Sequence, residues 1–277
     1  MRALFSIVCL GLQIVRIFEG FYTSTDHSPA SICYTYRMNT KHIPLRPGGF
    51  KLTEIAASKA ALTKDSNALD IGCGTGASLE YIMKHYGCHV FGVDCSEKAI
   101  SIAKTRFVNA TDSDPNAPHL LTADASALPH PDNSFDLVMM ECTLTLFDDP
   151  AQALKEATRV LKPEGMLFIS ALTQRKQSDK TLHTADARSN LASPELVKSG
   201  LLHADNLTNL LSELGFHQIS HTERNDVLVQ FVADAIFTYG SLDHYIKEAS
   251  ACIDGCVLNC NISPKEAGYS YFLATKH

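Results

Sequence analysis

Short apolar segments alternate with amphipathic helical segments from Gly49 onward. This alternation restricts the possible folds more than any other feature of the sequence. The predicted strands are Ala68–Ile71, Cys88–Val93, His119–Thr122, Phe135–Met140, Met166–Ala171, Phe216–His221 and Gly268–Ala274. The predicted helices are Phe50–Leu62, Ala77–Tyr86, Ser96–Asn109, Pro150–Leu161, Asn206–Leu214 and Val227–Ala251. Strands that alternate with helices form a mostly parallel sheet with right-handed crossovers, so we predict an α/β, doubly wound fold with helices on both faces.

The composition narrows the classes of protein that fit this pattern. The chain has 277 residues, 45% hydrophobic and 19% charged, as is typical of a globular protein. A formal net charge of −6 provides no basic field, so nucleic acid is not an expected partner. Nine cysteines are an odd number, too few for a disulfide scaffold. They indicate a reducing compartment, so we predict a cytoplasmic protein.

The first 37 residues differ from the rest of the chain. The apolar run Ala3–Val15 is about 13 residues long, shorter than the roughly 20 that span a bilayer as a helix. No signal-peptidase site follows it, and no membrane partner is expected. We interpret residues 1–37 as a non-domain extension, a mis-assigned start before Met38 or a signal-like segment. Residues 38–277 are then the domain, with 174–200 and 227–261 as its substrate-side cap.

A glycine-rich turn joins the first predicted strand to the next helix. Its sequence is LDIGCGTG, and the glycines at 72 and 74 allow a tight turn whose backbone N–H groups approach a ligand. With Ala77 it also fits the loose dinucleotide pattern G-x-G-x-x-G/A. Asp70 separates the two interpretations, because its carboxylate would repel a pyrophosphate but favour the ammonium and sulfonium groups of S-adenosylmethionine.

Two more acids end the next two predicted strands. Asp94 lies 22 residues after Gly72, where a carboxylate can accept both ribose hydroxyls. Asp124, with Ala125 beside it, follows the third strand and can accept from an adenine amino group. Either acid alone is common in a strand-end turn. Together with Asp70, they predict a nucleoside site at the carboxyl edge of the sheet.

Four motifs occur in order along the chain: LDIGCGTG, VFGVDCSEKAI, TADASALPHPDNSFDLVMM and EATRVLKPEGMLFIS. They closely resemble those of class I S-adenosylmethionine-dependent methyltransferases with a methyltransferase type 11-like domain. The resemblance covers Leu45–Ala171 strongly. The segment Leu45–Phe50 also looks like the opening of an uncharacterised bacterial branch of that superfamily.

The resemblance implies a seven-stranded, Rossmann-like sheet of order 3-2-1-4-5-7-6 whose last strand is antiparallel. It also implies that Gly72, Cys73, Gly74 and Gly76 hold the methionine part of S-adenosylmethionine, with Asp70 near its amino group. Asp94 would bind ribose and Asp124 adenine. Cys95 would flank the adenine ring, and Ala125 would lie beside Asp124.

The fourth predicted strand brings Glu141 and Cys142 to the expected position of the methyl group. Methyl transfer from a sulfonium is an in-line displacement, and the cofactor already carries the activation. Glu141 is therefore a candidate for orienting the substrate, for acting as a base or for contacting the cofactor. Cys142 is either a catalytic thiol or a packing residue. We expect a small-molecule acceptor, whose identity the sequence does not give.

Three further cysteines, Cys252, Cys256 and Cys260, form a C-x3-C-x3-C pattern. Three thiolates can bind zinc or a trivalent metalloid. The spacing matches no standard zinc pattern, so the main interpretation includes no metal and treats these cysteines as a weak candidate.

Three alternatives to a small-molecule methyltransferase remain. The cysteines motivate an arsenite methyltransferase, although their spacing departs from the pattern of that family. A non-catalytic S-adenosylmethionine-binding protein would keep the same fold. An NAD-dependent oxidoreductase is disfavoured by Asp70 and by the lack of a Tyr-x-x-x-Lys pair.

Overall fold

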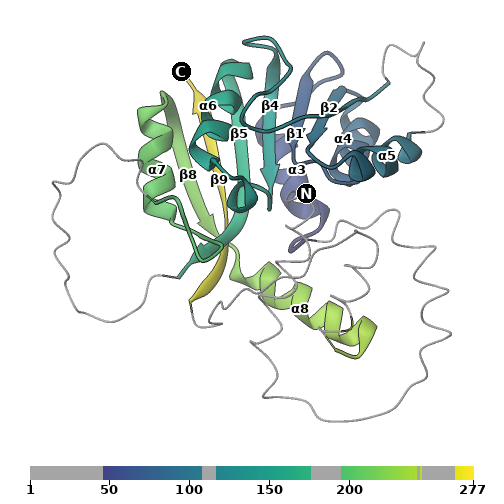
Figure 1. Cartoon of the computed structure of the whole chain (residues 1–277), viewed down its shortest axis with the longest axis vertical. Helices are drawn as coiled ribbons and strands as arrows, with labels where there is room; N and C mark the ends of the chain where they lie inside the picture. The colour runs from purple at the N-terminus through teal and green to yellow at the C-terminus, as the bar shows by residue number, and fades with distance from the viewer. Residues whose placement is uncertain (1–45, 108–116, 176–194, 242–243, 245–265) are drawn as a thin grey trace, which may run out of the picture.

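A twisted, mostly parallel sheet lies at the centre of the structure, with helices on both faces (Figure 1). The computed structural model describes residues 46–107, 117–175, 195–241, 244 and 266–277. The predicted extension 1–37, the three cysteines at 252, 256 and 260, and much of the predicted cap lie outside these described residues.

The order of the strands is the predicted one. From one edge it runs β3-β2-β1-β4-β5, and the last strand in the chain, β9, pairs antiparallel with both β5 and β8. If the seven long strands are numbered by their order in the chain, β8 is the sixth strand and β9 the seventh. In that numbering the order in the sheet is 3-2-1-4-5-7-6. The strands are β1 Asn67–Ile71, β2 His89–Asp94, β3 His119–Thr122, β4 Phe135–Glu141, β5 Leu161–Gln174, β8 Phe216–Glu223 and β9 Ala267–Lys276.

The helices begin and end where local signals place them. The Ser96 side chain accepts from the N–H of Ala99 at the start of α5, and Asp149 does the same for Gln152 at the start of α6. Gly87, in the left-handed conformation, ends α4. The helices are α3 Phe50–Lys59, α4 Ala77–Tyr86, α5 Glu97–Arg106, α6 Pro150–Val160, α7 Ala204–Glu213 and α8 Asn225–Tyr239.

Two elements differ from the prediction. The helix predicted over 227–251 ends at Tyr239, because Gly240 takes a left-handed conformation with φ 76°. A short hairpin of β6 Val197–Lys198 and β7 Leu201–Leu202 begins inside 174–200, which we interpreted as part of the cap, and was not predicted. Its two-residue turn has positive φ at both Ser199 and Gly200, as a type I′ turn requires.

Two apolar cores hold the helices against the sheet. One gathers buried residues of α3, α4, α5 and α8, and the other those of α6 and α7. The fourth strand is buried along Leu137–Glu141, as its nearly continuous apolar sequence predicts for a strand covered on both faces.

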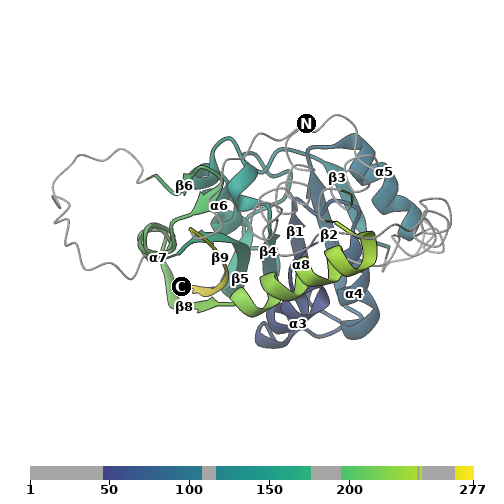
Figure 2. The same cartoon turned by 90° about the horizontal axis from the view of Figure 1, so that it is seen from below.

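The position of α8 bears on the predicted cap. Figures 1 and 2 show α8 beyond the edge of the sheet to which the arrowhead of β4 points. This carboxyl edge is where open α/β sheets bind ligands. Among the described residues, no helix combines the length and the apolar character needed to cross a bilayer.

Candidate functional site

An open cavity lies at the carboxyl ends of β1, β2 and β3. Its volume is about 610 Å³ when the solvent at its mouth is included. Five of the residues predicted to bind a cofactor line it together: Gly72, Asp94, Cys95, Asp124 and Ala125. The structure thus brings residues from three strand ends to one hollow, as the positions of the acids in the sequence predict.

The sequence prediction missed one wall of this cavity. Leu146, Phe147, Asp148 and Asp149 also line it. Leu146 and Phe147 are both half-buried there. The signal that was overlooked is the N-cap Asp149 before Pro150, since a helix start after a strand end lies at the ligand edge.

The glycine turn folds closely against its neighbours. Gly72 has φ 78°, and a Cβ there would lie 2.5 Å from Cγ2 of Thr143. The N–H groups of Gly72 and Cys73 both donate to the carbonyl of Val93, at 2.8 and 3.0 Å. Gly76, at φ 75°, is the N-cap of α4. Only glycine has the room and the freedom to form the start of this turn.

Cys73, which we predicted to contact the cofactor, is buried at 7% exposure and is not among the cavity residues. Burial raises the pKa of its thiol well above the usual range. Its backbone N–H already donates to Val93. The structure therefore gives this side chain a packing position under the turn.

Asp94 ties the turn to the end of β2. One carboxylate oxygen accepts from the N–H of Gly74 and the other from that of Ser96, both at 2.9 Å. Burial raises the pKa of Asp94, while these two hydrogen bonds oppose the shift. Each carboxylate oxygen has a second lone pair, so Asp94 can accept two ribose hydroxyls while it keeps both backbone bonds.

Asp124 differs from Asp94 because it is exposed. Its Oδ1 accepts from both the N–H and the hydroxyl of Ser126, at 2.7 Å each. These hydrogen bonds lower the pKa of Asp124, so it stays ionised at neutral pH. Among the described residues both bonds go to Oδ1, so the second oxygen can accept from a ligand.

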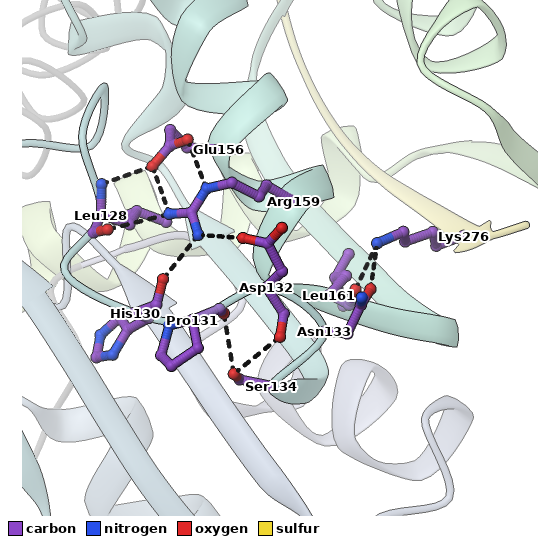
Figure 3. Close-up of polar contacts among 10 residues, drawn as sticks. All are labelled: Leu128, His130, Pro131, Asp132, Asn133, Ser134, Glu156, Arg159, Leu161 and Lys276. Carbon is purple, nitrogen blue, oxygen red and sulfur yellow. Dashed lines mark hydrogen bonds and ion pairs between the residues drawn. The ribbon is translucent and has the colours of Figure 1, made fainter.

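Side chains of α6 hold the loop that carries Asp124 (Figure 3). Arg159 donates to the carbonyl oxygens of Leu128 and His130, at 3.0 and 2.7 Å, and to the carboxylate of Glu156 at 2.7 Å. Glu156 accepts in turn from the N–H of Leu128 at 2.8 Å. Residues 123–126 begin the same loop, so α6 anchors the segment that lines the cavity.

Asp70 is on β1, two residues before Gly72, at 3% exposure and is not among the residues that line the cavity. Its Oδ1 is buried and accepts no hydrogen bond from any described residue. Burial, and then the nearby Glu141 carboxylate, raise the pKa of Asp70 well above its usual range. A buried carboxylate without a full set of partners is costly, and a bound cation would supply what it lacks.

Glu141 is already engaged by other residues. Arg46 forms an ion pair with it at 2.7 Å, and the hydroxyls of Ser78 and Thr53 donate to it at 2.8 and 3.1 Å. Its side chain is 2% exposed. This arrangement fits a group that organises the site better than a free base. Arg46 belongs to the opening segment singled out in the sequence, but no spacing rule joins it to Glu141.

Cys142 is buried at the end of β4, with φ 60°. Its Sγ lies 3.0 Å from the hydroxyl of Tyr269 on β9. Burial raises the pKa of the Cys142 thiol to about 11, so it is not a thiolate at neutral pH. Because the thiolate is the nucleophile and the metal or metalloid ligand, these facts favour a packing role.

Comparisons with known proteins agree with this geometry. Residues 69–169 match the family model of a methyltransferase domain. A demethylmenaquinone methyltransferase of Listeria monocytogenes is 31% identical over 157 residues, which are 56% of this chain and 60% of that protein. The matched segments span 49–60% of the length of three curated relatives and about 30% of two others.

Two solved structures share the fold over most of this chain. A phosphoethanolamine N-methyltransferase of Haemonchus contortus, solved with S-adenosylhomocysteine, has a TM-score of 0.64 at 18% identity, covering 89% of this chain and 57% of that one. The [4+2]-cyclase SpnF has a TM-score of 0.62 at 22% identity, covering 98% and 93%.

The fold and the domain match define a Rossmann-like domain of the methyltransferase class. Residues 69–169 are the part of the chain that matches this domain model, and the curated relatives that the chain resembles include methyltransferases.

Proposed function

We propose that this chain is a methyltransferase that transfers the methyl group of S-adenosylmethionine to a small-molecule acceptor. The cavity carries the proposal, because Asp94 and Asp124 line it from successive strand ends beside the glycine turn. The domain match and the structural neighbour solved with S-adenosylhomocysteine support S-adenosylmethionine as the cofactor. The names of the curated methyltransferase relatives, among them demethylmenaquinone and phosphoethanolamine enzymes, support a small acceptor.

In this proposal each carboxylate holds one part of the cofactor. Asp94 accepts the ribose hydroxyls, and Asp124 accepts the adenine amino group, with Cys95 and Ala125 beside the ring. Asp70 lies toward the cationic methionine end, where its unpartnered oxygen favours a positive charge. Gly72, Gly74 and Gly76 keep the backbone close to that end.

Bound S-adenosylmethionine supplies an activated methyl group, so the protein has to align the acceptor and exclude water. Glu141 and Cys142 lie at the end of β4, at the expected acceptor side. We assign Glu141 a positioning role, because Arg46, Ser78 and Thr53 already hold its carboxylate. A general base is needed only for a protonated acceptor such as a hydroxyl.

A second candidate is a protein that binds the cofactor but catalyses a different reaction. The structural likeness to SpnF, a [4+2]-cyclase, favours this alternative, because it shows that the fold does not fix the reaction. The alternative of an arsenite methyltransferase is less well supported, because the Cys142 thiol that would bind arsenic is buried and its raised pKa keeps it protonated. A cytoplasmic location and the absence of a nucleic-acid partner stay predictions.

Binding titrations with S-adenosylmethionine, S-adenosylhomocysteine and NAD+ test the cofactor. We expect the two sulfur nucleosides to bind and NAD+ to bind weakly or not at all; tight binding of NAD+ alone would overturn the proposal. Incubating the protein with methyl-labelled S-adenosylmethionine and a metabolite extract then tests the reaction. A labelled small molecule supports methyl transfer, whereas cofactor binding without any labelled product favours the second candidate.

A further inference from the structure

A second group of polar side chains lies at the opposite edge of the sheet from the cavity. Glu164 is near the start of β5, His217 is near the start of β8, and His277 follows the end of β9. One potential ligand atom of each lies within 4.8 Å of the other two. Figure 1 shows this end of β9 on the side away from α8.

Glu164 has an unusual backbone conformation. Its φ is 61°, in the left-handed region that favours glycine and disfavours a long side chain. The carboxylate nevertheless faces its neighbour, because Oε2 lies 3.8 Å from Nε2 of His217. Strained backbone of this kind occurs at functional sites as well as in tight turns, so the side-chain geometry around Glu164 carries the argument.

The backbone around His217 is irregular as well. The pairing of β8 with β9 shifts between His217 and Ser220, and Gln218 has φ 50°. Such bulges redirect a side chain on a strand. Nε2 is the ring nitrogen of His217 that faces Glu164, and the other nitrogen, Nδ1, is buried with no hydrogen-bond partner among the described residues. The rings of His217 and His277 meet edge to face, with centroids 5.3 Å apart.

We propose that Glu164, His217 and His277 bind a divalent first-row metal ion, with zinc as the best match. Two imidazoles and one carboxylate are a known zinc ligand set, which leaves a fourth position for water. Bonds of about 2.0–2.1 Å place the ligand atoms of a tetrahedral site about 3.3 Å apart. The ligand atoms must move together to reach this, from 3.8 Å between Glu164 and His217 and from within 4.8 Å for the pairs with His277.

The ion would link three segments that are distant in sequence. It would join the start of β5 to the start of β8 and the end of β9. At this end of the sheet Phe216 pairs with Lys276, and Met166 pairs with Thr275. The site lies far from the cofactor cavity along the strands. We therefore assign the ion a structural role in this part of the sheet.

Zinc titration of the purified full chain tests the proposal. We expect the wild type to bind one zinc ion that Glu164→Asn, His217→Ala and His277→Ala each weaken at least about tenfold. Asn tolerates a positive φ, so Glu164→Asn removes the ligand without adding backbone strain. His85→Ala is the control, because His85 is exposed on α4 and outside the cluster.

Two further measurements, of Tm and of the cobalt spectrum, test whether the zinc binds at Glu164, His217 and His277. Zinc should raise the Tm of the wild type but not of Glu164→Asn, while both proteins bind S-adenosylmethionine equally. Cobalt in place of zinc should show no thiolate charge-transfer band, which separates this site from any cysteine site. The proposal is overturned if Glu164→Asn binds zinc as the wild type does, or if the bound cobalt is ligated by thiolates.

Discussion

Gly72 and Gly74 lie in the same turn with positive φ, but only Gly72 lacks room for a side chain. A Cβ at Gly72 would meet Thr143 at 2.5 Å, whereas nothing lies within 4 Å of one at Gly74. Alanine in a left-handed conformation costs about 1–2 kcal/mol at either position. We predict that Gly72→Ala lowers the free energy of unfolding by about 1–3 kcal/mol more than Gly74→Ala, because of the added overpacking. Urea unfolding of both variants measures this difference, and equal losses would contradict it.

The raised pKa of Asp70 has a consequence for cofactor binding. Burial keeps more of this carboxyl protonated than an exposed Asp, and a cationic ligand favours its ionised form. Affinity for S-adenosylmethionine should therefore increase as pH rises toward the pKa of Asp70 in the free protein, and level off above it. Asp70→Asn should bind more weakly and lose this pH dependence. Titrations over a pH series measure it; a wild-type affinity that falls with rising pH would contradict it.

The same shift makes a second, independent prediction about stability. A carboxyl whose pKa is raised on folding binds protons more readily in the folded state than in the unfolded state. Its contribution to stability is therefore lost as pH rises from 3.8, the unperturbed value, through the raised one. We predict that Asp70→Asn stabilises the free protein at neutral pH, as measured by urea unfolding. A destabilised variant would show that Asp70 has partners which the structure does not indicate.

At the residue scale, the sequence predicted the site residues whose location follows from their position at the end of a strand. Asp94 and Asp124 end successive strands, and their shared cavity follows from the parallel sheet. The ion pair of Arg46 with Glu141 joins residues 95 positions apart through tertiary packing. No local pattern specifies such a contact. The packing positions of Cys73 and Cys142 also depend on burial that the sequence does not give.

At the scale of elements, the loop after β3 depends on α6. Arg159 and Glu156 hold its backbone at Leu128 and His130 (Figure 3). We predict that Arg159→Met leaves the fold intact but weakens cofactor binding several-fold, because the segment with Asp124 loses its anchor. The control is Lys162→Met, which removes an ion pair with Asp136 at 2.8 Å that does not hold the loop. Titration with S-adenosylmethionine measures both, and equal affinities would contradict the prediction.

Most element boundaries could be predicted because local signals and periodicity agree. The helix Ala77–Tyr86 and the strand His119–Thr122 match the prediction at both ends. The fifth strand is longer than expected, because pairing with β9 extends it to Gln174 and Leu161 at its start pairs with Phe135 of β4. The hairpin β6–β7 was missed, since strands of two residues are too short for any periodicity.

At the scale of the whole molecule, the sheet separates two proposed sites. The carboxyl edge carries the cofactor cavity, and the amino end of β5 carries Glu164 near His217 and His277. We propose residues 38–277 as the methyltransferase domain, with 174–200 and 227–261 as its substrate-side cap. We predict that a chain beginning at Met38 binds S-adenosylmethionine as tightly as the full chain. An affinity lowered tenfold or more would show that residues 1–37 contribute to the site.

Calorimetric titration of S-adenosylmethionine into the wild type, Asp94→Ala and Asp65→Ala is the most direct test of how the cofactor is held. Asp65 is the matched control, because its side chain is exposed and forms an ion pair with the neighbouring Lys64. We predict binding to the wild type and to Asp65→Ala with equal affinity, and a loss of at least about tenfold, about 1.4 kcal/mol, for Asp94→Ala. An Asp94→Ala variant that binds as tightly as the wild type would contradict the proposed carboxylate site.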